Sequence, residues 1–246
     1  MPTPRTRGLA LITVLWLISL LTLLATAVLA ITRNHGRISA RTAQIAAAEI
    51  VADSAIRLTL LQINAPLNDG QPLQFSANWP LKLFDQTVNV QIEREAGRVD
   101  LNSTDASLLA AVFMAGGIDA GQAASFASRI IDWRHTAPFE TVGELRQVPG
   151  FADLRPEVLD AFTVYSTRSP TIVLEFAHPL VRGALSRLTN PPVSATTGPQ
   201  LLIGQVARIR TCASKDAVKR CRVAIARVTG NRLKPFMIYG WYTDGL

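Results

Sequence analysis

The chain changes abruptly from polar to apolar positions at Gly8. Arg5 and Arg7 lie just before it, and residues 9–31 then contain no charged side chain and only four with a hydroxyl group. A helix over these residues, at about 1.5 Å of rise each, would be roughly 34 Å long and could cross a bilayer core of about 30 Å. The pattern therefore predicts one membrane-spanning helix over residues 9–31.

The helical pattern continues beyond this apolar run. Residues 32–63 contain no proline and a single glycine, Gly36. One face of this part is apolar, and the opposite face has Asp53 four residues before Arg57, an order that favours a helical ion pair. We expect one long helix over residues 9–63, half of it in lipid.

A cleaved secretory signal is the alternative interpretation of the apolar run. Residues 25–27 read Ala-Thr-Ala, which has the small-x-small form of a signal peptidase site. Secretory apolar regions are usually shorter, about 7–15 residues, and the helical pattern here passes straight through this site. Retention of the helix is therefore favoured. Arg5 and Arg7 precede the run, whereas Arg33, Arg37 and Arg41 follow it. Charge therefore does not settle the orientation and leans weakly against an N-terminus on the inside.

After a loop rich in proline, asparagine and glycine, the period changes to two. Val88, Val90 and Ile92 alternate with polar residues, as in a half-buried strand. Residues 96–97, Ala-Gly, are expected to turn this strand into a small hairpin with the segment RVDLN. Strand-like sequence returns near the end of the chain in three segments: 200–210, 220–229 and 235–243.

Between the two groups of strands, residues 103–165 have a helical period. Asp119 with Gln122 and Thr141 with Glu144 have the spacing of a capping box, and Gly-Gly and Pro-Gly pairs supply stops. These signals predict four short helices, over 104–115, 120–133, 142–147 and 156–163. Their shared core is expected to contain Leu108, Leu109, Val112, Phe126, Ile130, Trp133, Leu145, Leu159 and Phe162.

The order of elements predicts an α+β fold in which a small all-helical insertion interrupts an antiparallel sheet. The strands before and after the insertion are expected to share one sheet, because neither group alone has enough apolar surface to be stable. The units after the long helix are strands over residues 64–102, the insertion domain over 103–165, and a linker with further strands over 166–246.

The net charge of +7 would suit an acidic partner. Nine of the basic residues, however, lie between Arg208 and Lys234 among alternating apolar ones. This distribution indicates the solvated face of strands.

Cys212 and Cys221 are the only cysteines of the chain. Both lie in strand-like sequence, so a disulfide across a hairpin in an oxidising compartment is one interpretation, and a pair of reduced thiols is the other. The spacing C-x8-C is not that of a metal site.

No catalytic constellation can be assembled from these residues. The histidines His35, His135 and His178 are not accompanied by H-E-x-x-H, G-x-S-x-G or a Gly-rich phosphate loop. A hard cation would need oxygen ligands, and three acids that could converge on one lack a regular ligand spacing: Asp132, Glu140 and Glu144. We expect a protein that is not an enzyme and has no metal site.

The segment FETVGELRQVPGFADL introduces a second class of function, because it resembles a helix-hairpin-helix DNA-binding element. Such a hairpin offers backbone N–H groups to phosphate. Here Ala152 replaces the second glycine, and Asp153 stands where a phosphate would approach. A membrane-anchored DNA-binding protein for DNA uptake is therefore the alternative, and no nucleic-acid partner is our main expectation.

The N-terminal segment RTRGLALITVLWLISLLTLLA resembles the class III signal of prepilins, which a dedicated peptidase cuts after the glycine while the apolar helix is retained. GRVDLNSTDASLLAAVF, ASRIIDWR and PFETVGELRQVPG resemble the inserted, SAM-like helical domain of the K-type minor pseudopilin of type II secretion systems, the GspK family. PFMIYGW is similar to the last strand of that family. The resemblance covers most of the chain in order and implies a pilin-like sheet.

The resemblance implies specific roles for residues near the N-terminus. Residues 1–8 would be a cytoplasmic leader, cut between Gly8 and Leu9, and Leu9 would then be N-methylated. Most pilins have a glutamate at position five of the mature chain, which meets the terminal amine of the subunit ahead, whereas this chain has Thr13. A lone carboxylate in the membrane costs about 2.5–3.5 kcal/mol, so Thr13 suits a subunit at the tip, unless it is an ordinary polar residue of a membrane helix.

The implied function is to cap the tip of the periplasmic pseudopilus and to support protein export across the outer membrane. The implied partners are the I-type and J-type minor pseudopilins, the major pseudopilin, the inner-membrane platform and the prepilin peptidase. The subunit would be a single-pass inner-membrane protein with its C-terminal part in the periplasm.

Larger members of the family that this chain resembles carry a longer helical insertion, with acidic residues after the tryptophan and calcium sites in the added part. Here only five residues separate Trp133 from Phe139, and His135 lies where an acid is common. We expect no cofactor, with calcium as the one that the resemblance leaves open.

Overall fold

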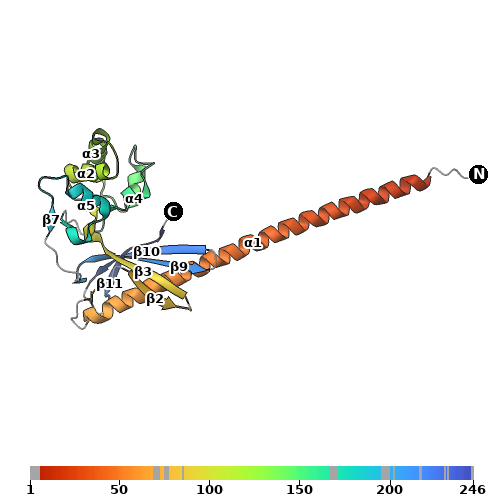
Figure 1. Ribbon diagram of the computed structural model, residues 1–246, viewed down its shortest axis with the longest axis horizontal. Helices are drawn as coiled ribbons and strands as arrows, with labels where there is room; N and C mark the ends of the chain where they lie inside the picture. The colour runs from red at the N-terminus through yellow and green to blue at the C-terminus, as the bar shows by residue number, and fades with distance from the viewer. Residues whose placement is uncertain are drawn as a thin grey trace, which may run out of the picture.

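The computed structural model describes residues 6–68, 73–74, 78–84, 86–166, 171–194, 200–201, 203–215, 218–229, 231 and 233–244. A long helix leaves the rest of the molecule as a bare rod, a sheet packs on its C-terminal half, and a helical unit lies beyond the sheet (Figure 1). Residues 1–5 of the expected leader lie outside the described residues.

The helix α1 (Thr6–Asn68) is 63 residues long, which corresponds to roughly 95 Å at 1.5 Å per residue. It continues without a break because no proline occurs between Pro4 and Pro66. The side chains of residues 11–33 are exposed. The C-terminal half buries one face, which includes Ala48, Ala52, Ala55, Ile56 and Ile63.

A five-stranded antiparallel sheet covers that face of α1, with the strand order β11-β10-β9-β3-β2. Its strands are β2 (Asn78–Leu83), β3 (Gln86–Arg94), β9 (Val206–Lys215), β10 (Val218–Val228) and β11 (Phe236–Asp244). Strand β3, which precedes the insertion, pairs with β9, which follows it. The prediction of one shared antiparallel sheet is therefore confirmed.

The core between α1 and the sheet follows from the alternation along β3. Val88, Val90 and Ile92 are buried as predicted, and the residues between them face away from the helix. Val90 and Ile92 pack with Ile56 and Ile63 of α1 in one cluster. Apolar residues recur at every second position of β3 and at every third or fourth position of α1. The strand and the helix therefore each present one apolar face, and the two faces cover each other.

The expected hairpin at residues 96–97 is wrong. β3 pairs with β2 instead, and the chain continues through η1 (Glu95–Gly97) into β4 (Val99–Asp100), which leaves the sheet. Gly97 lies so close to the backbone of Phe176 that a Cβ there would be 1.9 Å from its carbonyl oxygen. The glycine therefore serves a close backbone approach and not a hairpin turn.

β4 pairs in parallel with β5 (Phe162–Thr163), so the points where the chain enters and leaves the insertion lie side by side. Two other short pairs lie outside the main sheet. They are β1 (Leu73–Gln74) with β8 (Gln200–Leu201) and β6 (Ile172–Val173) with β7 (Val193–Ser194), and η3 (Leu174–Phe176) follows β6.

The insertion contains α2 (Ala106–Ala115), α3 (Ala120–Thr136), η2 (Val142–Gln147) and α4 (Pro156–Leu159). The start signals act as predicted: the Asp119 carboxylate accepts from the backbone N–H of Gln122, and Thr141 with Glu144 form a capping box. The last helix is shorter than expected, because residues 162–163 form β5.

A further helix, α5 (Pro179–Leu185), lies in the segment that we expected to be a linker. His178 caps it, and Pro179 occupies its first turn, a combination that marks a helix start. It joins the core of the insertion through Val181, Ala184 and Leu185.

The core of the insertion has four packed phenylalanine rings at its centre, from Phe113, Phe126, Phe151 and Phe162, with centroids 4.3–5.8 Å apart. Seven of the nine core residues named from the sequence are buried there, and Trp133 and Leu159 pack at its margin. The prediction of a separate helical core is therefore confirmed.

Candidate functional site

The first candidate surface is the bare half of α1. Its large apolar side chains are exposed, with Trp16 at 75%. The hydroxyl groups of Ser19, Thr22 and Thr26 donate to carbonyls of the preceding turn at 2.8–3.0 Å. The polar groups of this segment are therefore satisfied within the helix, as an apolar environment requires. By length and composition this is the one described helix that could cross a membrane.

The residues with implied N-terminal roles all belong to this helix. Gly8 and Leu9 lie in the first turns of α1, and Thr13 is an exposed residue of the third turn. The backbone around the implied cleavage point is helical from Thr6 onward.

A second group of contacts fixes the other half of α1 to the sheet. The Asp53 carboxylate accepts from Arg222 Nε at 2.8 Å and from Trp241 Nε1 at 2.7 Å. The Arg57 guanidinium lies over the Trp241 ring, 5.9 Å from its centroid. The expected pairing of Asp53 with Arg57 is therefore wrong: Asp53 is bound by Arg222 of β10 and Trp241 of β11, and Arg57 packs on the ring of the same tryptophan.

The structure joins Cys212 and Cys221 by a disulfide. The two residues face each other directly in the β9–β10 pair, with their Cα atoms 4.1 Å apart. The bond links neighbouring strands at the part of the sheet that packs on α1.

The third group is a network of charged residues at the junction between the sheet and the insertion. Arg98, at the end of η1, donates to Glu93 Oε2 at 2.6 Å and to the backbone carbonyl of Asp160 at 2.8 Å. Arg208 of β9 donates to Glu95 Oε1 at 2.6 Å and to Asp160 Oδ1 at 2.9 Å. Asp160 follows α4, so it connects the insertion to both arginines.

Glu95, Arg98 and Arg208 are all largely removed from water, with 0%, 4% and 12% exposed. The expectation that all basic residues from Arg208 onward form a solvated face is thus wrong for Arg208. The alternation along β9 was interpreted correctly, but near Val206 the face opposite α1 is not solvated. Val206 there forms an apolar cluster with Val223 and Ile225 of the neighbouring strand β10, and Tyr165, which follows β5, packs on it. A charge in this position is stabilised only by a partner of opposite sign.

The pKa values at the junction show that the charged forms are retained. Burial by itself raises the pKa of Glu95, but Arg208 and Arg98 outweigh it, so the pKa lies below its usual value. The same balance, with the same two arginines, lowers the pKa of Asp160. Burial lowers the pKa of Arg208, but Glu95 more than reverses this.

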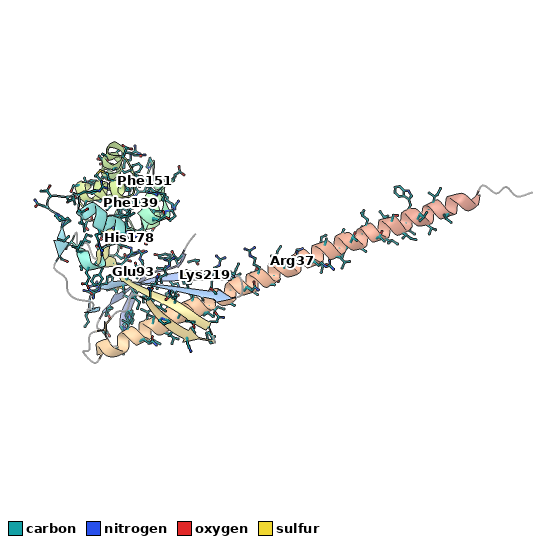
Figure 2. The ribbon with its side chains drawn as sticks, viewed as in Figure 1. Arg37, Glu93, Phe139, Phe151, His178 and Lys219 are labelled. Atoms are coloured by element: carbon teal, nitrogen blue, oxygen red, sulfur yellow. A yellow bond between two sulfur atoms is a disulfide. The ribbon has the colours of Figure 1, made fainter. Side chains whose placement is uncertain are left out.

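His178 lies between the insertion and the sheet, on the same side as Glu93 (Figure 2). Burial lowers its pKa, and Asp160, whose Oδ2 lies 3.6 Å from His178 Nε2, offsets this only in part. Its Nδ1 accepts from the backbone N–H of Leu180, so the proton of the neutral ring belongs on Nε2, towards Asp160. We therefore treat this contact as a polar interaction of a neutral imidazole.

The remaining candidate residues are engaged in local structure. The Glu144 carboxylate accepts from the N–H groups of Glu140 and Thr141 in the capping box, while Asp132 and His135 are exposed. Among the described residues, no group of three or more His, Cys, Asp or Glu side chains could hold a metal ion.

The hairpin that resembles a helix-hairpin-helix element is used for packing. Gly150 has a φ of 91°, and a Cβ there would lie 2.5 Å from Arg129 Nη1. Arg129 donates to the carbonyl of Pro149 at 2.7 Å, and Phe151 is fully buried in the core. The side chain that follows the glycine therefore anchors the loop to the domain.

No sequence signal pointed to the junction network. Glu95, Arg98 and Asp160 are ordinary charged residues in the sequence, and their partners come from segments far away along the chain. Asn102 was missed for the same reason. Its amide exchanges two hydrogen bonds with the backbone of Phe139, at 2.8 and 2.9 Å, and so joins the start of the insertion to the loop between α3 and η2.

No protein-family model matches this chain, and no curated protein matches its sequence. Among solved structures, the chain is similar to a chain in the crystal structure of the GspK–GspI–GspJ complex from the enterotoxigenic Escherichia coli type 2 secretion system. The TM-score is 0.57 at 11% identity, and the match covers 85% of this chain and 99% of that chain. The chain therefore has the pilin-like α+β fold of a chain in that type II secretion complex.

Proposed function

We propose that this protein is a K-type minor pseudopilin of a type II secretion system, which caps the tip of the periplasmic pseudopilus and supports protein export. The observation that carries the proposal is the shared fold, which extends over 99% of a chain from the GspK–GspI–GspJ complex. The class III signal pattern and the three insertion segments support it independently of that comparison. The role is structural, and we assign it no catalytic residue and no cofactor.

The proposed mechanism is packing by the bare half of α1. Before assembly, this apolar surface is covered by lipid, and in the fibre it is covered by the equivalent helices of sister subunits. An exposed apolar surface of this size requires a cover of one kind or the other. The same apolar surface of α1 suits both environments, the membrane and the fibre, because lipid tails and helix side chains are similarly apolar.

The tip position is supported by the arrangement of the insertion. The helical unit lies at the far side of the sheet from the free end of α1 (Figure 1). The ion pairs of its Asp160 with Arg98 and with Arg208 of β9 hold it there. A rigid domain in this position would occupy the space that a further subunit would need above the sheet.

The other parts of the proposal follow from this role. The prepilin peptidase cuts between Gly8 and Leu9, Leu9 is then methylated, and Thr13 takes the place of the usual glutamate because no subunit lies ahead. The partners are the I-type and J-type minor pseudopilins, the major pseudopilin and the inner-membrane platform. The Cys212–Cys221 disulfide supports a periplasmic location for the sheet, because disulfides persist in oxidising compartments.

Processing of the N-terminus tests the pilin part of the proposal. Gly8→Trp should block cleavage by a co-expressed prepilin peptidase, because the bulky side chain occupies the position next to the cut bond. The measurement is N-terminal sequencing and the mass of the purified chain. Gly36→Trp is the matched control, since a Cβ at this glycine meets no atom within 4 Å. A Gly8→Trp chain that is processed like the wild type would contradict the class III signal.

Labelling of assembled pseudopili tests the tip part. An epitope inserted after the exposed Asp153 would lie on the surface of the insertion domain. Immunogold microscopy should then show label at one end of each fibre, and the same epitope on the major pseudopilin should label the whole length. If the epitope after Asp153 were labelled along the whole fibre, the proposed tip position would be contradicted, while the pilin assignment would still stand.

A further inference from the structure

The part of α1 that follows the apolar run carries a row of three arginines. Arg33, Arg37 and Arg41 recur at every fourth residue, and no aspartate or glutamate occurs between residues 9 and 48. Each step of four residues turns the helix by about 40° beyond a full turn, so the three side chains lie on one side. All three are exposed. We name them the arginine row.

Among the residues that the structure describes, no aspartate or glutamate forms an ion pair with the arginine row. The first acid after it, Glu49, lies 3.9 Å from Arg220 Nε, and the next, Asp53, is bound by Arg222. Among the described residues, the ion pairs all join residues outside the row. The row is therefore a compact positive surface on an otherwise uncharged length of helix.

The arginine row begins where the apolar run ends, at Ile31. With a rise of about 1.5 Å per residue, the Cα atoms of Arg33, Arg37 and Arg41 lie roughly 3, 9 and 15 Å beyond it. A headgroup layer is about 5–7 Å thick. Side chains on a helix tilt towards its N-terminus, which here is the side of the apolar run, so all three guanidinium groups lean back towards that layer.

The other basic residues of the molecule are less suited to reach the same layer. Figure 2 shows Arg37 on the bare part of α1 and Lys219 at the end of the sheet nearest to it. Lys219 adjoins Arg220, whose partner Glu49 is 18 residues beyond Ile31, or roughly 27 Å. This exceeds the Debye length of about 8 Å at physiological ionic strength. Among the described basic residues on this side of the apolar run, the arginine row is therefore the group that lies nearest to the membrane.

We propose that the arginine row binds the phosphate groups of anionic phospholipids in the leaflet on the side of the sheet. The planar guanidinium donates two parallel hydrogen bonds to a phosphate, and the row presents three such groups to a layer of matching charge. The bound lipids set the depth at which the unassembled subunit sits in the membrane. This inference rests on the proposed membrane-spanning role of α1.

The expected strength follows from the position of each residue. A basic side chain close to an anionic surface contributes about a fivefold preference, and this decreases with distance from the surface. The contribution should therefore fall in the order Arg33, Arg37, Arg41. If only the total charge of the row mattered, the three arginines would contribute equally to the lipid preference.

The test uses the full-length chain in detergent micelles that contain phosphatidylglycerol and phosphatidylcholine in equal amounts. Native mass spectrometry then counts the lipids of each kind that stay bound. The wild type should retain phosphatidylglycerol with a preference of about tenfold or more. The triple variant R33Q/R37Q/R41Q should bind the two lipids equally. R182Q/R187Q/K234Q is the matched control, because it removes three exposed basic residues elsewhere and should keep the preference.

Three results would overturn the inference. They are a triple variant that keeps the wild-type preference, a control that loses it equally, and displacement of the lipid by millimolar inorganic phosphate, which would indicate a site for free phosphate. Alkaline carbonate extraction of membranes separates this from the proposed function. Extraction of the wild type by carbonate would contradict the proposed membrane-spanning role of α1. A wild type that stays in the membrane but shows no lipid preference would contradict only the proposed lipid binding by the arginine row.

Discussion

At the scale of single residues, the buried charges of the junction show how strongly a side chain depends on its partner. Glu95 is fully buried, and its nearest cationic atom is Arg208 Nε at 2.6 Å. Burying either charge without its partner is costly, so Glu95 and Arg208 each need the other in order to be buried. The loss of one partner therefore costs more free energy than the intact pair contributes to net stability.

Replacing Arg208 by methionine should therefore destabilise the protein by about 3–5 kcal/mol, because it leaves a buried carboxylate unpaired. The measurement is urea unfolding of the full chain in detergent, followed by circular dichroism. Arg210→Met is the matched control, two residues along the same strand. Arg210 is half exposed in its pair with Asp244, so its loss should cost less than about 1 kcal/mol. Equal effects of the two changes would contradict the role of burial.

At the scale of elements, β9 and β10 connect the parts of the molecule. β9 pairs with β3, packs on α1 through Ala207 and Ile209, and contributes Arg208 to the junction. The Cys212–Cys221 disulfide holds this strand to β10. Thr211, fully buried between them and the helix, donates to the carbonyl of Ala52 at 2.8 Å. The hairpin therefore fixes the sheet against the helix.

Removing the disulfide with the double change Cys212→Ala and Cys221→Ala should lower the free energy of unfolding by about 2–3 kcal/mol. The chain-entropy relation for a loop closed by a sequence separation of 9 gives this value. Unfolding of the full chain in denaturant measures it. The wild type under reducing conditions should match the double variant, and a double variant as stable as the oxidised wild type would contradict a structural disulfide.

At the scale of the whole molecule, the junction joins two separate hydrophobic cores. The insertion has its own phenylalanine cluster, and the sheet has its own core with α1. The parallel pair β4–β5 brings both ends of the insertion to one place, and the charges around Asp160 lie next to it. The orientation of the proposed tip domain thus depends on a small, charged contact.

This contact predicts a dependence of stability on acid pH. The pKa values of Glu95 and Asp160 are lowered in the folded state, so the unfolded state binds more protons as the pH falls. The stability they contribute is present above their unfolded values, about 4.3 and 3.9, and is lost as the pH falls further, towards the folded pKa values. Unfolding at several pH values measures this slope. The variant Glu95→Gln with Arg208→Met should have a weaker slope, and an unchanged slope would assign the effect to other carboxylates.

The sequence by itself determined the elements whose signals are local. The uncharged run and the absence of proline predicted α1, the capping residues Asp119 and Thr141 predicted the helix starts of the insertion, and the alternation at Val88 and Val90 predicted the buried face of β3. These signals depend on contacts within a few residues, so a single chain segment contains them in full.

Only the tertiary structure decided what each element meets. The sequence predicted a turn at Gly97, but the glycine is needed there because the backbone of Phe176 lies so close. Asp53 accepts hydrogen bonds from Arg222 and Trp241 and not from its helical neighbour Arg57. Arg208 followed the alternation of a solvated strand face and became buried because the insertion side of the molecule covers that face. Period and spacing determine which way a side chain points, whereas the partner that meets it comes from a segment far away in the sequence.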